Sequence, residues 1–221
     1  MLFDLRSRGR RRTVQTVYLF LALILGGGLV LFGVGAGNGF GGILNAFTGN
    51  GSGGAQKQVI SQQEKDALRA TSLRPNDPSG WAQLVQARWT SAGQGNNYNT
   101  TTGTFTATGK KELTATVQAW QRYAQLTKKP DPNIAVLAAR AYGGLGDFAG
   151  QASAWEIEAR SNPSEPKGFE CLAAAAYAAK QNHKGDLATS KAMSLVPKAQ
   201  QLQIKQQLQQ AKTNPQIAQS C

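Results

Sequence analysis

The amino-acid sequence predicts an all-α protein, in which one membrane-spanning helix is followed by a short array of paired helices. Residues 14–34 carry no charged side chain. From Gln56 onward the composition changes to Ala, Gln, Leu and Lys, the mixture that amphipathic helices use. Pro163 and Pro197 are separated by a period of about 34 residues, which is typical of stacked pairs of helices.

The N-terminal segment predicts a membrane anchor. Residues 1–13 are basic, with Asp4 as their one acidic residue. As a helix, the uncharged run that follows would be about 30 Å long, which matches the hydrocarbon core of a bilayer. The arginines mark the cytoplasmic side, so we expect a span over 14–35 with the rest of the chain extracytoplasmic in the cell membrane. A cleaved signal peptide is the alternative, because Val34-Gly35-Ala36 would roughly serve as a cleavage site, although the apolar run is long for one.

Glycines gather at the end of this predicted span. Gly33 and Gly37 form one GxxxG pair, and Gly35 and Gly39 form another. Such pairs let membrane helices approach closely, so a helix–helix contact through the anchor is one expectation. The alternative is that the helix frays here into a flexible Gly-rich linker, which we place at 36–56.

The proline spacing divides the predicted helical domain, 57–212, into repeats. Counting back one period from Pro163 reaches Lys129, which is next to Pro130. Pro75 lies further back than one more period would place it. The excess matches the length of a segment rich in Thr, Asn and Gly at 91–110, which we interpret as a polar insertion forming a short β-hairpin or an ordered loop.

Apolar and small residues recur at the positions where a helix pair of this period needs them. The inner stripe of the first helix of a pair falls on alanines in the second repeat and on Phe169 and Leu172 in the third, and Gly146-Asp147-Phe148 predicts a turn. Over about residues 61–197 the chain therefore resembles the tetratricopeptide repeat (TPR) family. It departs from that pattern at Arg88, Gln151 and Glu158, which replace one aromatic residue and two alanines.

The resemblance implies a scaffold that binds a protein or peptide partner in a concave groove. The overall plan of basic start, anchor and repeat domain is similar to that of the TPR-bearing ancillary subunits of the Sec translocon. Translocation or chaperone accessory work is therefore one expectation. The TPR pattern places the groove on the first helices of the repeats, and carried onto this chain it gives the following candidate partner-binding residues: Gln86, Trp89, Asn133, Arg140, Lys167 and Tyr177. The alternative for Trp89 and Tyr177 is that they fill gaps between repeats.

Catalytic and cofactor motifs are missing from the sequence. It contains no P-loop, GxSxG or HExxH pattern and a single histidine, so we expect no enzyme, no cofactor and no metal site. The net charge is +12, but Lys and Arg are scattered singly along the helical part, which argues against nucleic acid as a partner. Two alternatives stay open: a basic module that binds an anionic polymer or lipid surface, and a structural oligomeric component of a surface assembly.

The two cysteines gain significance from the predicted topology. Disulfides persist outside the cytoplasm, so Cys171 and Cys221 are a possible pair. A bridge between them would hold the C-terminal tail, 213–221, against the last repeat. Two free thiols or an intermolecular bridge are the alternatives.

Overall fold

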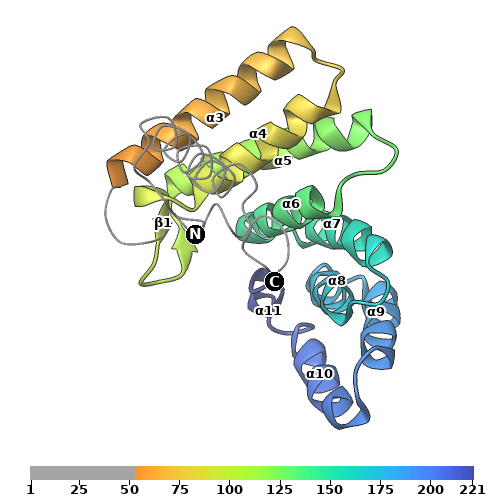
Figure 1. Ribbon diagram of the computed structural model, residues 1–221. Coiled ribbons are helices and arrows are strands. Elements are labelled where there is room, and N and C mark those ends of the chain that lie inside the picture. The colour runs from red at the N-terminus through yellow and green to blue at the C-terminus, as the bar shows by residue number, and fades with distance from the viewer. Residues whose placement is uncertain (1–52) are drawn as a thin grey trace, which may run out of the picture. The chain divides into compact units, whose positions relative to one another are not determined.

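The structure is a computed structural model that describes residues 53–221, with side chains from Gln62 onward. These residues form one compact unit, and the all-α class is confirmed for them (Figure 1). The described residues contain nine α-helices, one 3₁₀ turn and one two-stranded hairpin. In chain order they are α3 (Gly53–Leu73), α4 (Pro78–Ala92), η1 (Gly95–Asn97), β1 (Tyr98–Asn99), β2 (Thr104–Phe105), α5 (Ala107–Leu126), α6 (Pro132–Leu145), α7 (Phe148–Ser161), α8 (Pro166–Ala178), α9 (Asn182–Ser194), α10 (Lys198–Gln210) and α11 (Gln216–Gln219).

The predicted N-terminus, 1–13, and the predicted span, 14–35, lie outside the described residues. From residue 53 onward no helix is both long enough and apolar enough to cross a membrane. The predicted linker, 36–56, ends later than the structure allows, because α3 already begins at Gly53. Ala55, Gln56 and Lys57 are good helix formers, which explains why the helix extends into that segment.

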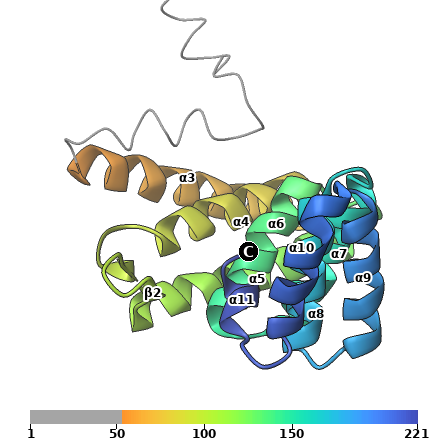
Figure 2. The ribbon, with the colours of Figure 1, turned by 90° about the horizontal axis from the view of Figure 1, so that it is seen from below.

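Each helix from α3 to α9 packs against the next one along the chain. Apart from the α4–α5 connection, which contains the β-hairpin, the connections from α3 to α9 are short, so successive helices form antiparallel hairpins (Figure 1). Helix α6 contacts α4 as well as α5, and α10 and α11 fold back beside α8 (Figure 2). The chain therefore builds a layered array in which neighbours in sequence are also neighbours in space.

Turn residues explain where the helices begin and end. Asp77 and Asp131 each precede a proline, and their carboxylates accept the backbone N–H two residues later, which caps α4 and α6. At the α6–α7 turn, Gly146 adopts the left-handed conformation (φ 79°) and Asp147 caps α7 by accepting from the N–H of Gly150. The turn after α8 instead uses Lys180, a residue with a side chain, at φ 62°.

The core is built largely from alanine. Alanines of α6 and α8 are fully buried, which lets the helix backbones approach closely, and larger side chains such as Trp120, Tyr123 and Trp155 fill the spaces between layers. Tyr142 and Tyr177 pack in the same way as each other. Each ring lies on the glycine eight residues later, Gly150 or Gly185, where an added Cβ would come within 2.5 Å of the ring.

The predicted insertion, 91–110, contains the hairpin, but both of its ends are helical. Helix α4 continues to Ala92 and α5 begins at Ala107, so the non-helical part is shorter than expected. The strands pair antiparallel, with Tyr98 opposite Phe105. The hairpin thus lies between the two helices of the first complete pair.

Candidate functional site

A pocket of about 760 Å³ lies where α4, the β-hairpin, α6 and the C-terminal tail meet. We call it the hairpin pocket. The residues of its lining that matter here are Trp89, Tyr98, Phe105, Lys110, Arg140, Gly144 and the tail residues Gln219–Cys221. A volume of this size falls within the range of pockets that bind ligands.

Three aromatic side chains form one wall of the hairpin pocket. Phe105 is central: its ring centroid lies 5.0 Å from that of Tyr98, edge to face, and 6.2 Å from that of Trp89. Both spacings suit favourable aromatic contacts. Gly144 of α6 makes room for this wall, because a Cβ there would lie 3.1 Å from the Phe105 ring.

Local hydrogen bonds hold the hairpin on the start of α5. The Thr106 hydroxyl donates to the carbonyl of Asn96 at 3.0 Å and accepts the N–H of Gly109, which caps the helix. The Asn99 side chain accepts the N–H groups of Thr101 and Thr102, as in an Asx turn. Gly109 allows a close approach to the carbonyl of Asn97, since an added Cβ would lie 2.1 Å from that oxygen. The aromatic wall therefore has a firm support.

Two cationic side chains complete the charged part of the pocket. Lys110 and Arg140 are both exposed, and no Asp or Glu is among the lining residues. Neither forms an ion pair within residues 62–221. The Arg140 Nε–H donates to a main-chain oxygen of Cys221, the last residue of the sequence, at 3.2 Å, and no other hydrogen bond of its guanidinium is formed with the described residues.

The tail forms the opposite wall. Cys221 is joined to the buried Cys171 of α8 by a disulfide, with a Cα–Cα distance of 5.6 Å. The amide of the buried Gln151 donates to the carbonyl of Ala218 at 2.7 Å. Gly143 leaves room for that amide, because a Cβ would lie 2.7 Å from its nitrogen. Helix α11 contacts both α6 and α8 (Figure 2), so the tail lies across two layers of the array.

The structure brings two of the predicted partner-binding residues together. Trp89 and Arg140 line the same pocket from α4 and α6. Gln86 is half-buried on α4 and does not line the pocket, while Asn133 and Lys167 are in the first turns of α6 and α8, also away from it. The six predicted residues therefore do not all line this pocket.

Tyr177 requires a correction, because its side chain is interior rather than exposed in a groove. It is 2% exposed, and its hydroxyl donates to the carboxylate of Asp186 at 2.7 Å and lies 3.1 Å from the hydroxyl of Thr189. The hydrogen bond from Tyr177 lowers the pKa of Asp186, and burial raises the pKa of Tyr177. Tyr142 and Tyr177 are one residue off an exact 34-residue spacing, so counting by the repeat period assigns them to different faces of their helices. In the structure both rings lie on a glycine of the following helix.

Sequence reasoning did not assign Tyr98, Phe105, Lys110 or the tail to a site. The alternation that places Tyr98 and Phe105 on one face of a hairpin was available as a pattern. Their contact with Trp89 depends on how the hairpin folds back on α4, which no local pattern shows. The position of the tail follows from the cysteine pairing, which the sequence left open.

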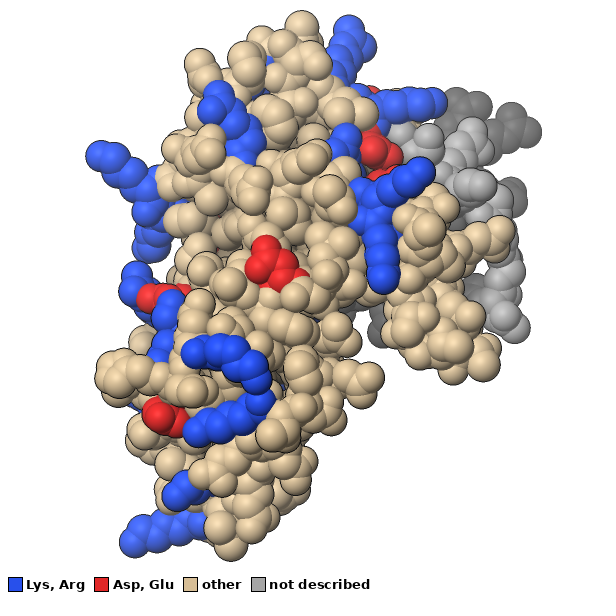
Figure 3. Space-filling view, turned by 180° about the vertical axis from the view of Figure 1, so that it is seen from behind, with Lys and Arg blue, Asp and Glu red and all other residues tan. Residues whose placement is uncertain are grey.

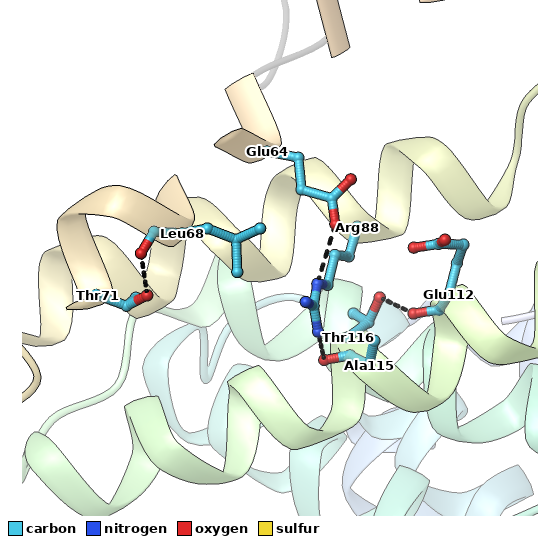
Figure 4. Close-up of polar contacts among 7 residues, drawn as sticks. All are labelled: Glu64, Leu68, Thr71, Arg88, Glu112, Ala115 and Thr116. Carbon is cyan, nitrogen blue, oxygen red and sulfur yellow. Dashed lines mark hydrogen bonds and ion pairs between the residues drawn. The ribbon is translucent and has the colours of Figure 1, made fainter. Parts of the chain in front are cut away.

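A second polar cluster holds α3 onto the array and lies apart from the hairpin pocket. The Arg88 guanidinium pairs with Glu64 at 3.3 Å and donates to the carbonyl of Ala115 at 3.3 Å, so it joins α3, α4 and α5 (Figure 4). Burial raises the pKa of Glu112, and the neighbouring Glu64 raises it further, while Arg88 opposes them. These contacts explain why an arginine suits position 88, where the predicted repeat pattern has an aromatic residue.

No group of three or more His, Cys, Asp or Glu that could hold a metal ion occurs between residues 53 and 221. Comparison with protein-family models, with curated proteins and with solved structures found no match to this chain. An aromatic wall beside the cationic side chains of Lys110 and Arg140 has the chemistry of a binding site, since it offers apolar contact and charge-assisted hydrogen bonds together.

Proposed function

We propose that this chain is a membrane-tethered scaffold of TPR type that binds a protein or peptide partner on the extracytoplasmic side. The observation that carries the proposal is the hairpin pocket, in which a helical array presents an aromatic wall beside Lys110 and Arg140. Loops placed on such a rigid scaffold often carry recognition. Translocation or chaperone accessory work is one form that this function would take.

The geometry of the helix pairs supports the TPR assignment. Helices α6 and α8 begin at Pro132 and Pro166, which are one repeat period apart, and the left-handed turn residues that follow them, Gly146 and Lys180, have the same separation. A helix pair of that length which packs mainly on its neighbours is the repeat unit of this family. The hairpin then interrupts an otherwise regular array at its first pair.

The Cys171–Cys221 disulfide supports an extracytoplasmic location, because disulfides persist in oxidising compartments. The arginine-rich start and the uncharged run at 14–34 support the same topology. Protease treatment of spheroplasts tests it. We expect the domain to be digested from outside, and a domain that stays protected until the membrane is lysed would contradict the location.

Site-specific photocrosslinking in intact membranes tests the binding function. We would replace Tyr98 in the hairpin pocket with p-benzoylphenylalanine, and Leu202 on α10, which is 66% exposed, as a matched control away from the pocket. We expect a partner protein to crosslink at position 98 and not at position 202. Crosslinks between copies of this chain alone would instead favour a structural oligomer, and equal crosslinking at both positions would sink the pocket as the site.

The alternative of a module for anionic polymers or lipid surfaces is less well supported. Figure 3 shows Lys and Arg side chains spread over one face as separate groups, with Asp and Glu between some of them. Binding dominated by polyanion contacts falls steeply with salt concentration. We expect partner capture to depend on the aromatic wall at about 150 mM salt and to change little between moderate salt concentrations.

A further inference from the structure

The tail, residues 213–221, contacts the array in the way that a bound peptide contacts its receptor. Its backbone forms no backbone–backbone hydrogen bond with α3 to α9 in the part of the chain that the structure describes. The hydrogen bonds of its polar side chains stay within the tail or reach the end of α10. What holds it on α6, α7 and α8 is a disulfide, a small apolar contact and two side chains of the array that donate to its main chain.

We propose that the tail is an intrachain ligand that closes a peptide-binding groove on α6, α7 and α8. Reduction of the Cys171–Cys221 disulfide frees this groove for a segment of a partner polypeptide that carries a small apolar residue. Because Gln219, Ser220 and Cys221 also line the hairpin pocket, the pocket continues into the groove once the tail leaves. The inference rests on the proposed partner-binding function and adds the control of access to it.

Gln151 of α7 is the main reason to regard the groove as built for a peptide backbone. It is fully buried, at a position where the predicted repeat pattern has an alanine. Its amide donates to the carbonyl of Ala218 at 2.7 Å, which is the one hydrogen bond that its side chain forms with the described residues, and its Oε1 has no partner there. Gly143 leaves room for the amide nitrogen. A buried polar group lowers stability unless it is satisfied, so the tail backbone explains why a glutamine stands here.

Arg140 and a small apolar contact complete the groove. The Arg140 Nε–H donates to a main-chain oxygen of Cys221 at 3.2 Å, so both polar side chains of the array bind the main chain of the tail. Ala218 is fully buried, and Ile217 packs against the core beside it. Main-chain hydrogen bonds give affinity without reading side chains, whereas the buried contact gives selectivity. The groove therefore accepts other segments that have a small residue at the place of Ala218.

The disulfide decides whether the tail occupies the groove. Helix α11 has four residues, too few to be stable alone, and residues 213–216 are exposed. The bond between Cys171 and Cys221 keeps the tail at an effective concentration that a free segment does not match. After reduction, the two hydrogen bonds and the packing of Ala218 and Ile217 must order the tail alone, so a competing segment displaces it.

Release requires a reductant from outside the chain, because its two cysteines are paired with each other. We assign this part to a dithiol. Cys171 is fully buried, while Cys221 is half-buried and lines the hairpin pocket, so a thiolate of the dithiol attacks the sulfur of Cys221. Cys171 leaves and takes up a proton, and the second thiol of the dithiol then displaces Cys221. Two thiols form on the chain as the dithiol becomes a disulfide.

Alkylation of Cys171 tests the release. In the full-length C221S protein, held in nanodiscs of neutral lipid, Cys171 is the only thiol. We expect maleimide to alkylate it at least about tenfold faster than a cysteine introduced as Thr116→Cys in a C171S/C221S protein, because Thr116 is equally buried but lies in α5. Equally slow rates would show that the tail stays in place without the bridge. Equally fast rates would show that the bridge holds the whole fold, and either result overturns the inference.

A peptide that copies residues 213–221, with Ser in place of Cys, tests the groove. We expect it at saturation to slow the alkylation of Cys171 in the C221S protein at least about tenfold, because it takes the place of the released tail. The same peptide with Trp in place of Ala should give no protection, since the position of Ala218 is fully buried. Equal protection by both peptides, or by neither, would contradict a groove that selects a small residue.

Gln151→Met, made in the C221S protein, separates binding from folding. It keeps the size of the buried side chain and removes its donor, so we expect protection by the peptide to need about tenfold more peptide. The thermal unfolding midpoint should be unchanged or higher, because an unsatisfied polar atom leaves the core. A lower midpoint with unchanged peptide protection would show that Gln151 serves the fold alone.

Reduction of the wild-type protein tests the control itself. By fluorescence anisotropy, the labelled tail peptide should bind at least about tenfold more tightly in dithiothreitol than to the oxidised protein, and reoxidation should reverse the gain. Equal affinity in both states overturns the control. Disulfide-linked dimers after reoxidation would identify the tail of a second copy as the occupant in place of a partner segment.

The crosslinking experiment at position 98 reports on the proposed function separately. A partner that crosslinks there, together with failure of the peptide tests, would overturn the intrachain ligand and leave the scaffold function standing. Success of the peptide tests without any partner crosslink would overturn the proposed function of the hairpin pocket alone.

Discussion

Lys180 has a backbone conformation that residues with side chains seldom adopt. Its φ is 62°, and it follows α8 at the repeat position where Gly146 follows α6. A Cβ in the left-handed region meets the following carbonyl oxygen, whereas glycine avoids that contact. The Lys180 side chain offsets part of the energetic cost of this conformation, because its Nζ donates to the carbonyl of Lys212 at 3.1 Å on the exposed surface. One residue thus carries a local strain that the equivalent turn lacks.

We predict that Lys180→Gly stabilises the protein. Removing the Cβ contact should raise the free energy of unfolding by up to about 1 kcal/mol, after the greater freedom of glycine in the unfolded chain is subtracted. The urea unfolding midpoint of oxidised protein measures it. Lys180→Ala is the matched control, because it removes the same hydrogen bond but keeps Cβ, and it should give no gain. Equal midpoints for the two variants would show that strain is unimportant here.

At the scale of single elements, the β-hairpin depends on one close approach. Gly109 lies in the first turn of α5, where an added Cβ would meet the backbone oxygen of Asn97 at 2.1 Å. Backbone cannot move aside as a side-chain end can. The hairpin carries Tyr98 and Phe105 of the aromatic wall. The position of the hairpin and the shape of the pocket therefore both depend on the close contact at Gly109.

We predict that Gly109→Ala displaces the hairpin. The forced shift should lower the free energy of unfolding by about 1–3 kcal/mol, the usual range for overpacking. It should also lower the yield of the partner crosslink at position 98, because Phe105 would no longer hold its place beside Trp89. Thermal unfolding and photocrosslinking measure the two effects. Thr108→Ala, at an exposed neighbouring position, is the control and should change neither. A fully stable Gly109→Ala protein would contradict the packing described.

The attachment of α3 has a pH dependence that follows from Glu112. Because burial and Glu64 raise its pKa, the folded state binds that proton more tightly than the unfolded chain does. The contribution of Glu112 to the free energy of unfolding therefore becomes more favourable as the pH falls from neutral through its raised pKa toward the ordinary pKa of Glu.

We predict that Glu112→Gln stabilises the protein at pH 7, by about 0.5 kcal/mol, as expected for removing a like-charge pair.

That gain should shrink as the pH falls through the raised pKa of Glu112, because the carboxyl of the parent protein is then itself protonated. Urea unfolding at a series of pH values measures it, with Glu165→Gln, an exposed residue before α8, as the comparison. A gain that is independent of pH would show that the desolvated charge is not its source. Figure 4 shows the three side chains whose charges decide the result.

Elements bounded by local chemistry could be predicted from the sequence, and those set by distant contacts could not. Helices end shortly before Pro75, Pro130, Pro163 and Pro197, because the chain cannot continue a helix into proline. The Gly146–Asp147 turn follows from the backbone freedom of one residue and the capping oxygen of the other. Tyr177, by contrast, was assigned to the wrong face, because a strict repeat count does not detect a ring placed on the glycine eight residues later.

At the scale of the whole molecule, the order of packing follows the order of the chain except at the tail. The tail returns to α6 and α8 after α9 and α10 have intervened, and the disulfide closes a loop with a sequence separation of 50. The hairpin pocket depends on that return, since its two walls come from segments far apart in the described chain. Neither a repeat pattern nor a local motif could have joined them.

This loop closure leads to a prediction about stability. Cross-linking two residues with a sequence separation of 50 restricts the unfolded chain, and the chain-entropy relation gives about 4 kcal/mol for a loop of that length. We predict that a C171A/C221A variant loses about 3–4 kcal/mol in free energy of unfolding, measured by urea denaturation against the oxidised parent. The parent under reducing conditions is the control and should match the variant. A loss below about 1 kcal/mol would mean that the apolar packing of Ala218 and the Gln151 hydrogen bond already hold the tail without covalent help. Reduction would then leave the tail in place as a wall of the hairpin pocket.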